Sequence, residues 1–193
     1  MTMNDETPRK ATVSDLYDVE GQAELIGGRI VRLPGHGILI GRVIGRIALS
    51  LHDYEERIKI GEIHTSTLGY VVPTLKSGRE SFCADVSYYI GPFPENPMAF
   101  IEGPPTFAVE IRDEADYGPE AEIVLAAKRR DYFEAGTRVV WDVDAPGKLI
   151  RAYRSDDPDR AVTWARGDRA DAEPAVPGWR IAVDDVFEPP ATG

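Results

Sequence analysis

Two apolar segments that each carry one carboxylate constrain the fold of this chain more than any other feature of its sequence. FCADVSYYI (82–90) and TFAVEIR (106–112) have the alternation and the aromatic and β-branched content of strands. If they are neighbours in one sheet, their apolar faces coincide, and Asp85 and Glu110 lie together on the opposite face. Because paired carboxylates repel unless a cation lies between them, the sequence predicts a cation site there.

Strict alternation also assigns the other residues of the two segments to faces. In the first segment it places the apolar set on one side: Phe82, Ala84, Val86, Tyr88 and Ile90. In the second segment Arg112 follows Glu110 on the same face. We therefore expect Arg112 close to the two carboxylates.

A lysine on a predicted helix supplies a third charged group. The helix begins near Pro119 and ends at Ala135, where Gly136 is suited to terminate it. Lys128 is at helical spacing from an apolar set: Val124, Leu125, Tyr132 and Ala135. A buried ammonium must pair with an anion or extend to water, so Lys128 either pairs with the two acids or reaches solvent. Near a scissile phosphate it could orient a water molecule or stabilise developing negative charge.

The available ligand atoms predict which metal would bind. Asp85 and Glu110 offer hard oxygen atoms, which favour Mg²⁺ or Mn²⁺ over zinc. The three histidines, His36, His52 and His64, are dispersed and lack the spacing of zinc ligands. The sequence has neither a serine nucleophile elbow nor a glycine-rich phosphate loop.

The charge balance limits how the chain could bind nucleic acid. Lys and Arg total 22 against 33 Asp and Glu, for a net charge of −11. Binding to random duplex depends on basic groups that displace counterions, so the composition argues against a tight general DNA binder. It does not exclude a nuclease whose metal supplies local positive charge. Candidate contacts to a nucleic-acid backbone are Arg42, Arg46, Arg129 and Arg130.

The 193 residues are expected to form one domain in the cytoplasm. The N-terminus has no hydrophobic signal core, no run of eighteen apolar residues could span a membrane, and the single Cys83 excludes an internal disulfide. We expect a disordered N-terminus (residues 1–10), a domain at 11–188 and a flexible tail at 189–193.

The order of elements predicts a mixed α/β or α+β fold, a sheet flanked by two substantial helices. A short helix is expected with Ser14 as N-cap, then a hairpin with a Gly27-Gly28 turn. A long helix at 38–58 has one apolar stripe. Strands follow, the first over 62–72, then the helix that carries Lys128, and further strands, the last in GWRIAVDDVF (178–187).

The motifs ELIGGRI, ADVSYY, AVEIR and AAKRRDYFEAGTRVVWDVD, in this order, resemble the Uma-two family of endonucleases, within the restriction-endonuclease-like PD-(D/E)XK superfamily. The similarity extends over about residues 12–188. It implies a central mixed sheet with flanking helices, here with extra C-terminal strands, and a metal-dependent nuclease. A homodimer with DNA as substrate is expected on the same ground.

The resemblance also implies roles for individual residues. Asp85 and Glu110 match the metal-binding acids of the superfamily, with the Ile111 carbonyl as a further ligand. Lys128 matches a lysine displaced from the strand to the following helix. Glu24 matches a recurrent family acid that completes the metal shell, and His36 matches a position before the long helix that often holds His, a candidate for substrate contact.

Two departures from the family pattern lie next to the predicted site. Ala84 precedes Asp85 where the family has Pro, and IRDEADYGP follows Glu110 where the family has a Val-Leu-Ser-Pro-Ser-like run. Arg112 stands where the unmodified motif keeps its lysine; it could stabilise charge but is too basic to accept a proton. The extra acids there, Asp113, Glu114 and Asp116, either assist a second metal or repel a phosphate.

These observations lead to one hypothesis and one rival. The hypothesis is a Mg²⁺- or Mn²⁺-dependent endonuclease with Asp85, Glu110 and Lys128 as its catalytic residues. The rival is a binding or assembly module that keeps the fold without turnover, which the net charge of −11 and the altered segment after Glu110 support.

Overall fold

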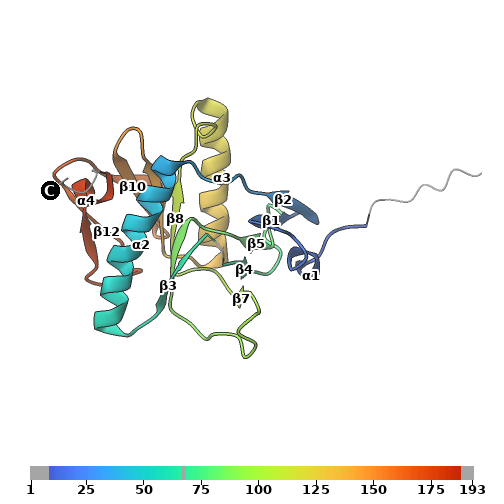
Figure 1. The fold of residues 1–193 in the computed structure, drawn as a ribbon. Coiled ribbons are helices and arrows are strands. Elements are labelled where there is room, and N and C mark those ends of the chain that lie inside the picture. Colours follow the sequence, from blue (N-terminus) through green and yellow to red (C-terminus); the bar gives the residue numbers. More distant parts are fainter. Residues whose placement is uncertain (1–8, 67, 188–193) are drawn as a thin grey trace, which may run out of the picture.

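In a computed structural model that describes residues 9–66 and 68–187, a six-stranded mixed sheet lies between two long helices (Figure 1). The helices of the described residues are α1 (Val13–Leu16), α2 (Ile38–Ile58), α3 (Pro119–Ala135) and α4 (Val183–Phe187). The first strands are β1 (Ala23–Ile26), β2 (Arg29–Arg32), β3 (Glu62–Thr65), β4 (Tyr70–Val71), β5 (Ser81–Phe82), β6 (Val86–Tyr89) and β7 (Ile101–Glu102). The later strands are β8 (Phe107–Ile111), β9 (Val139–Asp144), β10 (Leu149–Arg154), β11 (Asp157–Trp164), β12 (Arg169–Asp171) and β13 (Arg180–Ala182). The mixed sheet and its flanking helices confirm the predicted fold class.

The central sheet has the strand order β11-β10-β9-β8-β6-β3. Only β8 and β9 are parallel within it, because α3 connects them, and the other neighbours are antiparallel. The pairing of β6 with β8 confirms that the two carboxylate-bearing segments are sheet neighbours. Asp85 immediately precedes β6, and its N–H donates to the Val109 carbonyl at 3.1 Å, so Asp85 lies beside Glu110.

One face of this sheet packs on α2, which has the bounds that its apolar stripe predicted. The stripe includes Ile47 and Leu51, both fully buried. From the sheet, Val86, Val109 and Trp141 belong to the same apolar cluster. Burial of such side chains stabilises each by about 1.5–3 kcal/mol, so the main core lies on the α2 side.

The other face packs on α3, and its apolar cluster is smaller. Tyr132 of α3 packs there with Ala108, Val140 and Phe82. Val124, which was expected on the apolar side of the helix, is 67% exposed. Of the residues expected on the apolar side of α3, Val124 is therefore exposed, whereas Tyr132 and Ala135 pack against the cluster as expected.

The N-terminal hairpin confirms the predicted Gly-Gly turn. Gly27 and Gly28 join β1 to β2 with φ angles of +60° and +72°, a conformation that glycine adopts without strain. The preceding short helix begins two residues earlier than expected: Thr12, not Ser14, is its N-cap. The Asp15 carboxylate accepts the Thr12 N–H at 2.7 Å, which fixes the helix start at this position.

The predicted strand at 82–90 is two strands. β5 pairs with β4 in a small three-stranded sheet, whereas β6 pairs with β3 and β8 in the central sheet. Alternation is lost at the passage between them, so Phe82 and Ala84 pack on the α3 side and Val86 on the α2 side. The expectation that these three residues share one face was wrong for this reason.

Two other segments, each predicted as one strand, form two elements in the structure. The segment 62–72 forms β3 and β4, which belong to different sheets. The segment 178–187 pairs as β13 with β12 and then continues as α4, which begins at Val183.

Residues 1–8 of the expected disordered N-terminus (1–10) and the whole expected flexible tail (189–193) lie outside the described residues. Arg9 forms an ion pair with Asp15. Among the described helices none is long and apolar enough to cross a membrane.

Candidate active site

A cavity of about 420 Å³ opens on the α3 side of the sheet, between the N-terminal hairpin, β8 and α3. It gathers residues that are distant in the sequence. Its charged and polar lining includes Glu24, His36, Arg79, Asp85, Glu110 and Lys128. All the residues predicted for catalysis therefore line one space.

Glu110 occupies the centre of a hydrogen-bond network. Its side chain leaves β8 towards α3, where Lys128 Nζ lies 2.8 Å from one carboxylate oxygen. The Tyr132 hydroxyl donates to the other oxygen at 2.6 Å. Burial raises the pKa of Glu110 to about 7, although Lys128 acts in the opposite direction. A cation bound near Glu110 would therefore stabilise the ionised form of this carboxylate.

Glu24 on β1 is the second anion that contacts Lys128, with Nζ at 3.2 Å. It also accepts the Cys83 N–H at 3.1 Å and pairs with the Arg79 guanidinium. Burial raises the pKa of Glu24, but Lys128 and Arg79 lower it more, and the net shift is downward. Glu24 is thus a firmly ionised residue with two cationic partners.

Lys128 remains charged in this environment. Burial lowers its pKa, but the carboxylates of Glu110 and Glu24 raise it more, so the net shift is upward. The predicted pairing of this lysine with acids is present, and it is not a lysine that extends freely to water.

Asp85 is held by two contacts of its own. The Ile111 N–H donates to one carboxylate oxygen at 2.7 Å, and His36 Nε2 lies 2.8 Å from the other. Burial raises the pKa of Asp85 and outweighs the lowering by Ile111 and His36. Both strand acids are therefore buried with raised pKa values, as expected for anions that lack a full counter-charge.

Arg79 and Tyr132 are residues of this site that the sequence did not reveal. Arg79 precedes β5 and joins Glu24 to Asp131 of α3, with 2.9 Å between its Nε and Asp131 Oδ2. No local pattern distinguishes an arginine in a turn as a buried ion. Tyr132 was assigned to the apolar side of α3; its position four residues after Lys128 was the signal that its hydroxyl could reach the same carboxylate.

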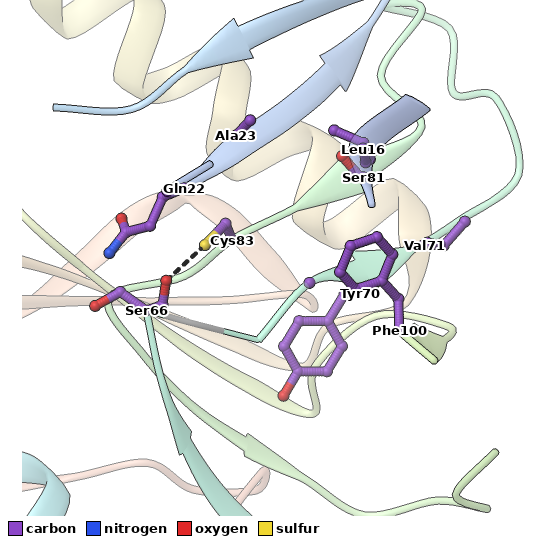
Figure 2. A pocket seen from close by; sticks show the side chains of 11 residues that line it. Leu16, Gln22, Ala23, Ser66, Tyr70, Val71, Ser81, Cys83 and Phe100 are labelled. Atoms are coloured by element: carbon purple, nitrogen blue, oxygen red, sulfur yellow. Dashed lines mark hydrogen bonds between the residues drawn. The ribbon is translucent and has the colours of Figure 1, made fainter. Parts of the chain in front are cut away.

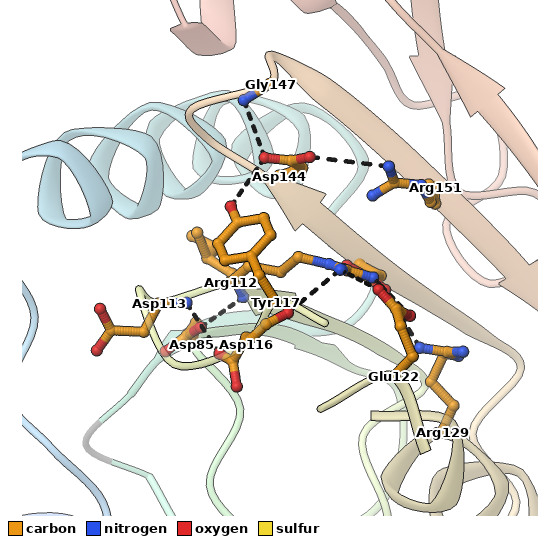
Figure 3. Close-up of polar contacts among 12 residues, drawn as sticks. Asp85, Arg112, Asp113, Asp116, Tyr117, Glu122, Arg129, Asp144, Gly147 and Arg151 are labelled. Carbon is orange, nitrogen blue, oxygen red and sulfur yellow. Dashed lines mark hydrogen bonds and ion pairs between the residues drawn. The ribbon is translucent and has the colours of Figure 1, made fainter. Parts of the chain in front are cut away.

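Arg112 is on the predicted face, but its guanidinium is already bound. It makes two bonds to Asp142, at 2.6 and 2.7 Å, and pairs with Glu122 at the start of α3 (Figure 3). Arg112 is only 6% exposed. The expected contact with substrate does not fit this position, because the carboxylates occupy the donors that a phosphate would need.

The loop after Arg112 brings two further acids to the cavity, Asp113 and Asp116. The Asp116 carboxylate accepts the Asp113 N–H at 2.8 Å (Figure 3). Glu114 is exposed and does not line the cavity. The role of these acids towards a second metal or a phosphate stays a prediction.

The other candidate arginines do not line the cavity. Arg42 and Arg46 are on α2, across the sheet, and Arg46 donates to the Asp185 carbonyl at 3.1 Å. Arg129 pairs with Asp142 at 3.2 Å and lies over the Tyr153 ring, whereas Arg130 is an exposed residue near Asp159. The structure therefore does not gather them into one basic surface beside the acids.

The cavity fits a hard divalent cation at Asp85 and Glu110. Both offer carboxylate oxygens, and burial has raised the pKa of each, which a bound cation would reverse. Glu24, which already has two cationic partners, is less available as a ligand. Among the described residues, three side chains with ligand atoms within 4.8 Å of one another occur only at His52, Glu55 and Glu56, on the surface of α2.

Comparison with known proteins adds a family and a fold. A family model described as "Uma2: Putative restriction endonuclease" matches residues 13–184. A crystal structure described as a "putative nuclease belonging to DUF820", from Anabaena variabilis, is similar with a TM-score of 0.72 at 16% identity. The match covers 91% of this chain and 97% of that chain. No curated protein matches the chain.

Proposed function

The chain belongs to the Uma2 family, and we propose on this premise that it is a Mg²⁺- or Mn²⁺-dependent endonuclease that hydrolyses phosphodiester bonds, with DNA as the expected substrate. One observation carries the proposal. Asp85 and Glu110 lie side by side in a cavity, both with raised pKa values, and Lys128 binds Glu110 at 2.8 Å. Such a combination of shifted acids and a fixed cation in one cavity is typical of catalytic sites.

Each residue of the cavity has a part in this mechanism. Asp85 and Glu110 would hold the cation, with the Ile111 carbonyl and Glu24 as further expected ligands. A cation bound there supplies polarisation of the scissile phosphate and a lower pKa for an attacking water. The Ile111 N–H and the Tyr132 hydroxyl fix the orientation of the two acids, since each donates to one of them.

Lys128 acts in this mechanism as a hydrogen-bond donor and a positive charge. Because two carboxylates keep its ammonium charged, it donates hydrogen bonds and does not accept a proton. It is therefore suited to hold a water or a phosphate oxygen and to stabilise negative charge as it develops.

Cleavage assays with purified protein test this proposal. Single- and double-stranded DNA and RNA are incubated with Mg²⁺ or Mn²⁺ and compared with Asp85→Ala, Glu110→Ala and Lys128→Ala. We expect each substitution to lower cleavage at least about a hundredfold, since each removes a charged group from the site. Glu114→Ala is the matched control, because Glu114 is an acid of the same region that does not line the cavity.

Calorimetric titration with Mn²⁺ separates the enzyme from its rival, a binding module that has lost turnover. Binding in the wild type that disappears in Glu110→Ala supports the enzyme. No binding at any usable concentration, together with equal residual cleavage in wild type and variants, would reject the enzyme and favour the module.

A further inference from the structure

A second cavity, of about 390 Å³, adjoins the candidate active site. Gln22 and Cys83 line both cavities, so these two residues form the partition between them. The volume is within the range of about 300–1,000 Å³ that is usual for small-molecule sites. The second cavity is therefore large enough for an organic group and opens next to the acids.

The second cavity has a polar end and an apolar end (Figure 2). Gln22, Ser66 and Cys83 gather at the end that borders the active site. Leu16 and Phe100 lie at the other end, together with Ser81, whose hydroxyl oxygen already accepts the Leu25 N–H at 2.7 Å. A ligand that matches this arrangement combines apolar surface with hydrogen-bonding groups on the side that faces the acids.

The walls of this cavity are fixed by contacts within the protein. The Phe100 ring stacks on the Tyr17 ring at 4.2 Å, and the Phe100 N–H donates to the Tyr17 hydroxyl at 3.0 Å. At the polar end the Cys83 thiol donates to the Ser66 carbonyl at 3.0 Å. These contacts hold Phe100 and Cys83 in place at the two ends of the cavity.

The charge distribution requires a source of affinity other than phosphate attraction. The chain has a net charge of −11, and Arg79 and Arg112 are both buried in ion pairs. In proteins that bind single strands, stacking of a base on an aromatic side chain contributes about 1–3 kcal/mol per base, and this contribution does not itself depend on positive charge. A cavity with an apolar wall beside the acids can supply such contacts.

We propose that the second cavity binds one unpaired nucleobase of the strand whose phosphate enters the active site. The inference rests on the proposed nuclease function and refines its substrate to strands with unpaired bases. A base that is stacked and paired in a duplex cannot enter a cavity without leaving the helix, which costs a few kcal/mol. Single-stranded or extrahelical nucleotides in DNA and RNA share the required chemistry.

Two variants test the proposal: one fills the second cavity with a larger side chain, and the other removes a polar group from its wall. Ala23 lines it but not the active site, so Ala23→Leu places extra carbon atoms where the base would lie. Gln22→Ala removes the amide at the partition. Met98→Ala is the control, because Met98 is 82% exposed on the same loop as Phe100 and lines neither cavity.

Binding is measured first, in EDTA, with labelled single-stranded DNA, single-stranded RNA and a duplex of the same sequence. We expect single strands to bind more tightly than the duplex, and Ala23→Leu to weaken single-strand binding about tenfold while duplex binding is unchanged. Competition by deoxyadenosine monophosphate distinguishes capture of a free nucleotide from binding that needs a strand. Circular dichroism melting of each variant shows that it is folded.

Cleavage with Mn²⁺ is then measured for the same substrates. If Ala23→Leu and Gln22→Ala bind and cleave single strands as the wild type does, the base-binding inference is wrong and the nuclease proposal stands. If the wild type binds single strands in an Ala23-dependent way but never cleaves, the nuclease proposal is wrong and the cavity assignment stands. If single strands and duplex lose affinity equally in Ala23→Leu, the effect is not base recognition and the inference is overturned.

Discussion

The two faces of the central sheet bury their side chains in different ways. Val109 and Glu110 are consecutive residues of β8, yet Val109 packs in the apolar cluster under α2 whereas Glu110 binds Lys128 and Tyr132 of α3. The α2 side is held by apolar contacts. The α3 side contains a chain of ions that runs from Asp131 through Arg79 and Glu24 to Lys128.

The two faces therefore make different contributions: one mainly stabilises the fold, and the other positions the residues of the candidate active site. Apolar burial is non-directional and scales with area, so the α2 side contributes stability that tolerates small shifts. Buried ions carry a desolvation penalty of several kcal/mol each and are stable only with partners at defined positions. The α3 side therefore contributes less stability but fixes the positions of the acids in the cavity.

The largest effect is expected from a cavity on the α2 side. Leu51→Ala removes a fully buried side chain and should lower the free energy of unfolding by about 4 kcal/mol. Urea denaturation measures this loss. Cleavage per folded molecule should be unchanged, and a large loss of specific activity would show that the two sides are not separable in this way.

The next effect concerns the ion chain. Arg79→Met leaves Glu24 and Asp131 without their shared cation and should cost about 3 kcal/mol. Adding Glu24→Gln and Asp131→Asn to Arg79→Met removes the unpaired charge of Asp131 and the charge of Glu24, which keeps Lys128 as a cationic partner, and should recover most of the loss. Denaturation of the single and triple variants measures both values; equal stability of the two would contradict the role of Arg79 as a paired ion.

The stabilisation of the protein by bound metal should depend on the acids of the α3 side and not on the apolar core under α2. At a Mn²⁺ concentration of 100 times the dissociation constant, linkage predicts about 2.7 kcal/mol for the wild type. Glu110→Gln should show none, because it removes a carboxylate of the expected site. Thermal unfolding with and without Mn²⁺ measures the shift, with Leu51→Ala as a destabilised control that should retain it.

The smallest effect is expected from one hydroxyl. Tyr132→Phe removes the 2.6 Å hydrogen bond to Glu110 and should cost about 1 kcal/mol of stability. Because the bond orients an acid of the site, kcat should fall while KM changes little. If Tyr132→Phe lowers the free energy of unfolding but leaves kcat unchanged, the Tyr132 hydroxyl has only a structural role.

The parts of the structure that local patterns encode were predictable. The helix at 38–58 follows from its apolar stripe, and the proximity of Glu110 and Asp85 follows from the pairing of the two segments that carry them as sheet neighbours. The contact of Lys128 with Glu110 extends the same reasoning to a helix that crosses the strand.

The parts that long-range pairing decides were not predictable. Arg79 binds Glu24 from 55 residues away, and nothing in its local sequence marks it as buried. The division of the segment 82–90 depends on which strands pair with its two halves, β4 on one side and β3 and β8 on the other. The exposure of Val124 likewise reflects what α3 packs against rather than its own spacing.

The passage from β5 to β6 joins the small sheet to the large one through three residues, Cys83 to Asp85. Cys83 borders the second cavity, and Asp85 holds its place beside Glu110. Because the linker is so short, a ligand that displaces Cys83 would also displace the backbone of Asp85. A ligand in the second cavity would thereby change the distance between Asp85 and Glu110 in the active site. Residues 83–85 would then couple base binding to cleavage.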